Sequence, residues 1–256
     1  MSEERSEENT VALVTGANRG IGQAFVQTLL DRGAKRIYVG ARNADDALDI
    51  AAPDPARIIP LTLDITDEAQ VRSAVAKAGD INLLVNNAGV AHFAGVYAAP
   101  TLDDARSEMD VNYFGTMAMC RAFAPVLEKN GGGGIINIVS IVGLVSTPVA
   151  GSYSASKAAL HSMTISLREE LRGQKTNVVA VYPGPVQTRM IKPIEDAMQD
   201  SMVTPDIIAA ASLDGLHAGE TEVFPGTAAD IRQGLIADPA AVQAQFAQLL
   251  PEAPAA

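Results

Sequence analysis

Tyr153 and Lys157 are four positions apart in the run SYSASKAA, which follows Gly151. On a helix this spacing places both side chains on one face, one turn from each other. A phenol beside an ammonium group is a potential proton-transfer pair, because a nearby positive charge lowers the pKa of a phenol from its ordinary value of about 10. On its own, such a pair is more often a plain contact on a helix surface. The rest of the sequence has to distinguish the two interpretations.

A glycine-rich turn, TGANRGIG, lies near the start of the chain at positions 15–22, between an apolar run at 10–15 and a helical pattern at 20–33. Glycines in such a turn let the backbone approach a pyrophosphate at the helix N-terminus, where free N–H groups favour an anion. The alternative, a tight turn made for helix packing, is disfavoured by the β-α-β context. The residues expected to contact a dinucleotide here are Gly16, Asn18, Arg19, Gly20, Ile21 and Gly22.

Arg42 follows the second apolar run, 36–41, at the place where an NAD site commonly has a carboxylate for the ribose 2′-hydroxyl. Arg19 can approach the same place from the glycine turn, and guanidinium groups bind phosphate oxygens in a forked geometry. The two arginines therefore favour NADPH over NADH. Both could instead be solvated surface residues, and Asp45 or Asp46 could compete for Arg42.

Apolar runs alternate with helical patterns along most of the chain, which predicts a single doubly wound α/β domain with a parallel sheet, the Rossmann fold. Asp64 and Ile65 close the third run, where a carboxylate could bond the adenine amino group and an apolar side chain could pack beside it. Asp64 could equally cap the next helix, for which Thr66 or Asp67 are the expected caps. Strands are expected at 10–15, 36–41, 57–65, 81–89, 134–140 and 176–184, and helices at 20–33, 68–77, 102–128, 151–172 and 240–250.

Composition narrows the class of protein. The net charge of −11 argues against a nucleic-acid partner or an anionic membrane surface, and no run approaches the roughly 20 apolar residues of a membrane span. Cys120 is the only cysteine, which excludes an intramolecular disulfide and favours the cytoplasm. His92, His161 and His217 are too scattered to predict a metal site. We expect a disordered acidic segment at 1–9 and the domain at 10–256, with an irregular excursion at about 186–205.

Taken together, the motifs resemble the short-chain dehydrogenase/reductase family in its compact single-domain form, from position 10 to about 225. They are TGANRGIG, Asp64, NNAG at 86–89, Asn112 in DVNYFGT, Ser140, YSASK at 153–157 and Pro183-Gly184. The resemblance implies Asn112, Ser140, Tyr153 and Lys157 as catalytic residues. It implies cofactor contacts from Asn87, Tyr153, Lys157, Val186 and Thr188, and a homodimer or homotetramer.

The chemistry expected of these residues is carbonyl reduction. A ketone that accepts hydride at carbon needs a proton at oxygen, and Tyr153 is the expected donor. Lys157 and the positive nicotinamide ring of the oxidised cofactor are together expected to lower the pKa of Tyr153. Lys157 is also expected to bond the nicotinamide ribose, while Ser140 holds the substrate oxygen as a neutral donor. The resemblance further implies that Asn112 supports a water that connects Lys157 to solvent.

The expected substrate is a hydrophobic or aryl ketone or aldehyde, reduced reversibly with NADPH. Its predicted walls are apolar, although Arg189 and Lys192 leave an acidic substrate open. Two other functions stay open. A 3-oxoacyl-acyl-carrier-protein reductase shares the motifs, and a nucleotide-sensing binding protein without turnover shares the fold, although such proteins typically lack the tyrosine or the lysine. The predicted wall residues are Ile141, Val142, Val145, Pro148, Met190, Ile191, Met198 and Met202, and the last helix carries an apolar stripe, Val242, Phe246, Leu249 and Leu250, that needs a partner in this subunit or a neighbouring one.

Overall fold

The computed structural model describes residues 7–251, except for the side chains of residues 197 and 200. The acidic segment expected at 1–9 therefore lies mostly outside the described residues. At its end, Glu7 is buried, and its backbone N–H donates a hydrogen bond of 2.8 Å to the carbonyl of Arg32. The described fold begins at this contact.

Within these residues, seven parallel strands form one sheet in the order β3-β2-β1-β4-β5-β6-β7, which confirms the predicted doubly wound Rossmann fold. The strand order reverses between β1 and β4. Chain connections leave in opposite directions at that point, so a crevice opens at the carboxyl ends of the strands. The strands are β1 Val11–Thr15, β2 Arg36–Ala41, β3 Ile58–Thr62, β4 Leu83–Asn86, β5 Gly133–Ile138, β6 Thr176–Val181 and β7 Glu222–Val223.

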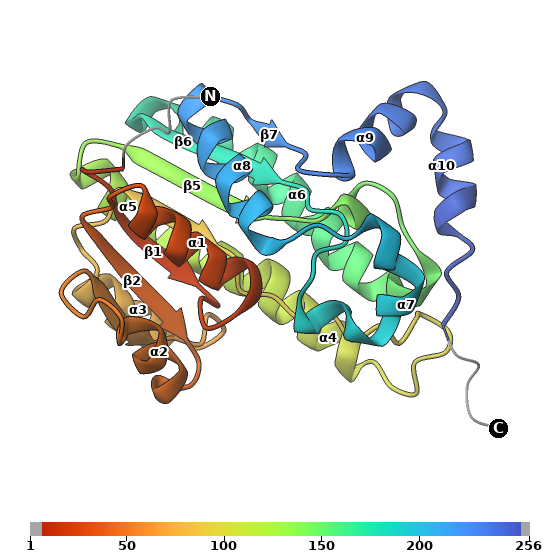
Figure 1. Cartoon of the computed structure of the whole chain (residues 1–256), viewed down its shortest axis with the longest axis horizontal. Coiled ribbons are helices and arrows are strands. Elements are labelled where there is room, and N and C mark those ends of the chain that lie inside the picture. The colour runs from red at the N-terminus through yellow and green to blue at the C-terminus, as the bar shows by residue number, and fades with distance from the viewer. Residues whose placement is uncertain (1–6, 252–256) are drawn as a thin grey trace.

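Helices cover both faces of the sheet (Figure 1). In β1, Ala12 and Val14 belong to the core on one face and Val11 and Leu13 to the core on the other, because side chains alternate along a strand. This explains why the strands are apolar throughout. One face packs against α1 Gly20–Asp31, α2 Ala44–Ala51 and α8 Pro205–Ala218, and the other against α3 Glu68–Lys77, α5 Thr116–Lys129 and α6 Gly151–Leu171.

The remaining helices lie around the crevice. α4 Asp103–Met109 precedes α5, and α7 Glu195–Met198 lies in the connection after β6. α9 Ala228–Ala237 and α10 Pro239–Phe246 form a hairpin at one side of the molecule, blue in Figure 1. No helix in the described range is long and apolar enough to cross a membrane.

The structure differs from the sequence prediction in four places. β3 ends at Thr62, so Asp64 and Ile65 lie in the connection after it. The helical pattern 102–128 is α4 and α5 joined by a π-helical stretch, Asp110–Gly115. The last helix stops at Phe246, and α2, α8, α9 and β7 were not predicted. Of the two expected caps of α3, Asp67 is the one that accepts the backbone N–H groups.

The glycine turn after β1 is fastened to the end of β4. The Asn87 side chain donates hydrogen bonds of 2.9 and 3.0 Å to the carbonyls of Thr15 and Gly16. The Thr15 hydroxyl accepts from the backbone N–H groups of Asn87 and Ala88. A Cβ atom at Gly22 would lie 2.4 Å from the Gly16 carbonyl oxygen, so glycine is needed there for close packing.

We expect Gly22→Ala to lower the free energy of unfolding by at least about 2 kcal/mol, because the clash is with backbone that cannot move aside. Gly173→Ala is the matched control. A Cβ at Gly173 meets nothing within 4 Å, so this variant keeps or slightly raises the stability. Urea unfolding of both variants measures the difference, and equal stabilities would contradict the packing argument.

Candidate active site

A cleft of about 1740 Å³ lies at the carboxyl ends of the strands. Sites for single small molecules usually occupy about 300–1,000 Å³, so the cleft has room for a dinucleotide and a second molecule. It runs from the glycine turn to α9 and α10. Most of the predicted site residues line it: Gly16, Asn18, Arg19, Gly20, Ile21, Arg42, Asp64, Ile65, Asn87, Ser140, Tyr153, Lys157, Val186 and Thr188. Two predicted residues, Gly22 and Asn112, support the cleft from behind.

The glycine-turn end of the cleft is suited to an anion. No side chain caps the N-terminus of α1 in the described structure, so its first N–H groups are available to a ligand. Arg19 and Arg42 line this end and are exposed, and neither forms an ion pair with any described residue. Asp46, a possible competitor for Arg42, instead accepts a 2.7 Å hydrogen bond from the Asn18 side chain.

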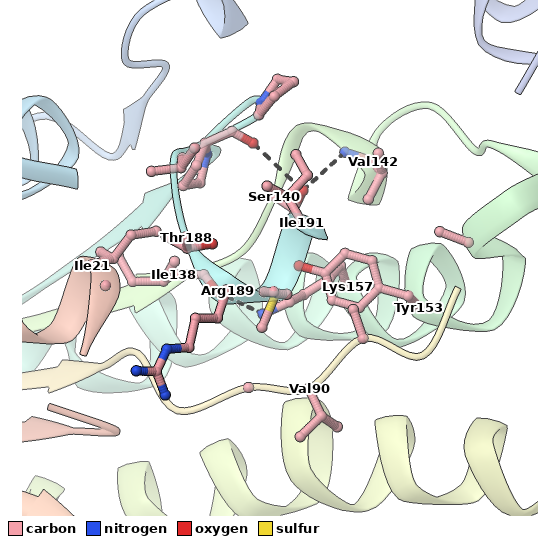
Figure 2. Close-up of a pocket in the computed structure, with 18 of the residues that line it drawn as sticks. Ile21, Val90, Ile138, Ser140, Val142, Tyr153, Lys157, Thr188, Arg189 and Ile191 are labelled. Carbon is pink, nitrogen blue, oxygen red and sulfur yellow. Dashed lines mark hydrogen bonds between the residues drawn. The ribbon is translucent and has the colours of Figure 1, made fainter. Parts of the chain in front are cut away.

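α6 carries Tyr153 and Lys157 into the other half of the cleft (Figure 2). As the spacing predicts, the Lys157 ammonium lies over the Tyr153 ring, 5.7 Å from its centroid. Lys157 is only 4% exposed, and its Nζ donates a hydrogen bond of 2.9 Å to the carbonyl of Ile138, at the end of β5. Burial in this position lowers the pKa of Lys157 to about 7.

Without a cofactor, the pKa of Tyr153 lies above its ordinary value, at about 12. Burial is the main cause, a hydrogen bond with Ser140 opposes it, and the Glu108 carboxylate adds a smaller increase. The physical reason is that the protein alone provides little positive charge beside the phenol, because burial also favours the neutral form of Lys157. Lowering the pKa of Tyr153 therefore requires a further cation in the cleft.

Ser140 stands where β5 leaves the sheet, across the cleft from α6 (Figure 2). Its Oγ accepts a hydrogen bond of 3.3 Å from the backbone N–H of Val142 and donates one of 3.5 Å to the carbonyl of Pro183. The second contact is long and therefore weak. The Ser140 hydroxyl is thus oriented by the backbone and by its hydrogen bond with Tyr153, and a ligand oxygen that replaces the long contact to Pro183 would bond both side chains.

Asn112 lies behind the cleft, buried in the π-helical stretch between α4 and α5. Its Oδ1 accepts from the backbone N–H of Val90, and its Nδ2 donates to the Val90 carbonyl and to Ser156 Oγ, all at 2.9 Å. Ser156 in turn donates to the Tyr153 carbonyl. The Asn112 side chain therefore ties α6 to the loop after β4, which explains an asparagine in a helical segment.

The loop after β4 has a second anchor besides the contact of Val90 with Asn112, the backbone of His92. The buried Glu108 accepts a hydrogen bond of 2.9 Å from the backbone N–H of His92. The next residue, Phe93, has φ of 54°, an unusual conformation for a large side chain. Its ring lies 6.5 Å from the ring of Tyr153. Glu108 and Asn112 thus hold a strained loop against the tyrosine.

The wall at the far end of the cleft is only partly the one predicted. Ile141, Val142, Met190, Ile191 and Met198 line the cleft, whereas Val145, Pro148 and Met202 are not among its lining residues. The sequence analysis missed the C-terminal contribution, although the apolar stripe of the last helix was a signal for it. The missed lining residues are Phe93, Ile231, Gln245, Phe246, Gln248 and Leu249.

Other reactive side chains lie apart from the cleft or are inert. Cys120 is buried, and burial raises its pKa to about 12. His161 packs as expected, with its Nδ1 2.6 Å from the Tyr182 hydroxyl. Among the residues that the structure describes, no three His, Cys, Asp or Glu side chains are grouped to hold a metal ion.

Comparison with known proteins agrees with this geometry. The sequence model of the short chain dehydrogenase family matches residues 10–199. The chain is 31% identical to a 3-oxoacyl-acyl-carrier-protein reductase of Thermotoga maritima, over 77% of this chain and 82% of that one. A short chain dehydrogenase of Burkholderia cenocepacia, solved in complex with NADP, is 41% identical, with a TM-score of 0.87 over 94% of this chain and 98% of that one. A 3-ketoacyl-acyl-carrier-protein reductase of Brucella melitensis, solved with NADH, is 28% identical, with a TM-score of 0.78 over 85% and 96%.

We expect Lys157→Met to stabilise the cofactor-free protein by about 2 kcal/mol at pH 6. The folded-state pKa of Lys157, about 7, lies below its ordinary 10.5. The destabilisation caused by the buried charge therefore has its full size below pH 7. It decreases as the pH rises from 7 and is lost at about pH 10.5. Urea unfolding at pH 6 and pH 10 measures it, with the exposed Lys77→Met as control. A stability difference independent of pH would be inconsistent with a buried, titrating ammonium.

Proposed function

Because the chain belongs to the short-chain dehydrogenase/reductase family of oxidoreductases, we propose that it reduces an apolar ketone or aldehyde to an alcohol with NADPH, reversibly. One observation carries the proposal. Ser140, Tyr153 and the buried Lys157 line the same cleft as the glycine turn, so a carbonyl group and a dinucleotide can meet there.

The residues present fit a dinucleotide. Gly20 has φ of 55°, and a Cβ there would lie 3.2 Å from Thr188 Cγ2, so the turn leaves a narrow space that a larger residue would fill. The uncapped N-terminus of α1 would hold the pyrophosphate. Arg19 and Arg42, without ion-pair partners among the described residues, would hold a 2′-phosphate, and Lys157 would bond the nicotinamide ribose.

The chain itself supplies the proton chemistry. When bound, a reduced nicotinamide supplies hydride to the carbonyl carbon. Ser140 donates a hydrogen bond to the carbonyl oxygen, and Tyr153 gives its proton to that oxygen as negative charge develops. Lys157 stabilises the Tyr153 phenolate that remains, and solvent then returns a proton to this phenolate. Asn112 is a positioning residue in this scheme, since its side chain is fully engaged by Val90 and Ser156.

A 3-oxoacyl-acyl-carrier-protein reductase is the second candidate, supported by the relatives of that name from Thermotoga maritima and Brucella melitensis. The net charge of −11 disfavours it, because an acidic carrier protein requires a basic docking surface. A nucleotide-sensing binding protein is disfavoured by the complete set of Asn112, Ser140, Tyr153 and Lys157. Cytoplasmic localisation and assembly into a dimer or tetramer stay predictions.

We expect NADPH oxidation with aryl or aliphatic ketones, and a loss of about 10²- to 10⁴-fold in kcat for Tyr153→Phe with unchanged NADPH binding. The decrease in NADPH absorbance with a panel of aryl, aliphatic and 3-oxoacyl-thioester carbonyls measures this. Turnover confined to the thioesters would replace the proposal with its second candidate. Cofactor binding without turnover of any carbonyl would contradict both.

We also expect Arg42→Ala and Arg19→Ala each to weaken NADPH binding by about tenfold or more and to leave NADH binding nearly unchanged, because only NADPH carries the 2′-phosphate. Titration of nucleotide fluorescence measures both affinities without any substrate. Arg172→Ala, on the surface beyond α6, serves as the matched control for the loss of one positive charge. Equal weakening of NADH and NADPH would refute the assignment of the arginines.

A further inference from the structure

The C-terminal strap, residues 245–251, crosses the end of the cleft furthest from the glycine turn. Phe246 and Leu249 in the strap line the cleft, together with the flanking glutamines Gln245 and Gln248. In Figure 1 this part of the chain descends from α10 along the side of the molecule. The family match ends at residue 199, so the strap lies outside the part of the chain that the family model matches.

The strap is fastened to the segment that leads from Ser140 to Tyr153. The carbonyl of Leu249 accepts a hydrogen bond of 2.9 Å from the backbone N–H of Val149, and the carbonyl of Phe246 accepts one of 3.2 Å from the Thr147 hydroxyl. Gln243, just before the strap, donates one of 3.0 Å to the Ser146 carbonyl. The strap is therefore held close to the residues that would bind the carbonyl oxygen.

The chemistry of the strap is apolar and uncharged. Its sequence, QFAQLLP, contains no ionisable side chain. Lys192 and Glu195, which line the side cavity together with the strap, pair with each other at 3.4 Å. Phe246 and Leu249 are half-buried, so each leaves apolar surface facing the cleft. Such a surface favours a group that is apolar and carries no charge.

Leu249 also separates the cleft from a side cavity of about 350 Å³. The residues that line both spaces are Val149, Lys192, Ile194, Glu195, Gln248 and Leu249. The next residue, Leu250, is 73% exposed and lines the side cavity without being among the residues that line the cleft. Leu249 is thus the one apolar side chain that the strap contributes to this shared wall, and the adjacent Leu250 is not part of it.

We propose that the C-terminal strap is the substrate wall of this enzyme: Phe246 covers the uncharged apolar substituent of the carbonyl substrate, and Leu249 limits its length. The inference rests on the proposed function for the identity of the substrate as a carbonyl compound. It names two specificity-determining residues and a substrate class, a ketone whose larger substituent is aryl or alkyl without a charged group.

Binding tests the strap without turnover. The chain contains no tryptophan and five tyrosines, so Phe246→Trp introduces a single tryptophan, which is excited selectively at about 295 nm. In a Tyr153→Phe background, which blocks turnover, and with NADP bound, 1-phenylethanol is expected to shift the emission of this tryptophan to shorter wavelength, and the charged analogue mandelate is expected to leave it unchanged. Leu250→Trp is the control and responds to neither. No response at position 246, or an equal response to both probes, would overturn the assignment.

Kinetics tests the length limit. In Leu249→Ala the ratio of kcat/KM for hexyl phenyl ketone to that for acetophenone is expected to rise about tenfold or more, because the cleft and the side cavity become continuous. In Leu250→Ala the ratio changes less than about twofold, and Tm and NADPH affinity confirm that both variants are folded. An unchanged ratio in Leu249→Ala overturns the strap inference and leaves the reductase standing. A tryptophan response without turnover of any ketone supports the strap and overturns the reductase.

Discussion

An ammonium group enclosed by protein is the feature on which the site depends. Lys157 is almost completely buried, and Ile138 provides the one hydrogen-bond acceptor it has among the described residues. Burying a charge with so little compensation is unfavourable, and here it lowers the pKa of the group to about 7. The fold tolerates this because α6 is tied to the end of β5 and, through Ser156 and Asn112, to the loop after β4. A ligand with hydroxyl groups beside Lys157 would relieve the penalty, so the same constraint connects the stability of the protein with its proposed chemistry.

The parallel sheet brings the parts of this site together. Because strand order reverses between β1 and β4, the glycine turn, the loop after β4, Ser140 after β5 and the segment after β6 all meet at one edge. The hydrogen bonds from Asn87 hold the loop after β4 against the glycine turn. α6 then adds Tyr153 and Lys157 from the side, and the C-terminal strap covers the far end. The same strand ends that form this edge of the sheet therefore position the parts of the site.

The sequence predicted the parts of the molecule whose signals are local. Strands buried on both faces, the glycine turn and the four-residue spacing of Tyr153 and Lys157 each follow from short-range patterns. α2 was missed because it is only eight residues long and three of them are aspartates, although its buried residues Ala47 and Ala51 lie one turn apart. The depth at which Tyr153 is buried, which raises its pKa in the protein without cofactor, could not be predicted, because burial depends on the assembled cleft and spacing does not reveal it. The strap was missed as a site element because residues almost a hundred positions apart, Thr147 and Phe246, meet there only in the folded chain.

The proposed reaction transfers hydride from NADPH to a carbonyl carbon while Tyr153 protonates the oxygen. Its most direct test is isotopic. The protein is given NADPH carrying deuterium at the transferable position of the nicotinamide, together with acetophenone, and the alcohol is analysed by mass spectrometry. The account predicts one deuterium on the carbinol carbon, and only a trace of labelled product with Tyr153→Phe. Bound NADPH with no deuterium in any alcohol would contradict it and would identify a nucleotide-binding protein without this reaction.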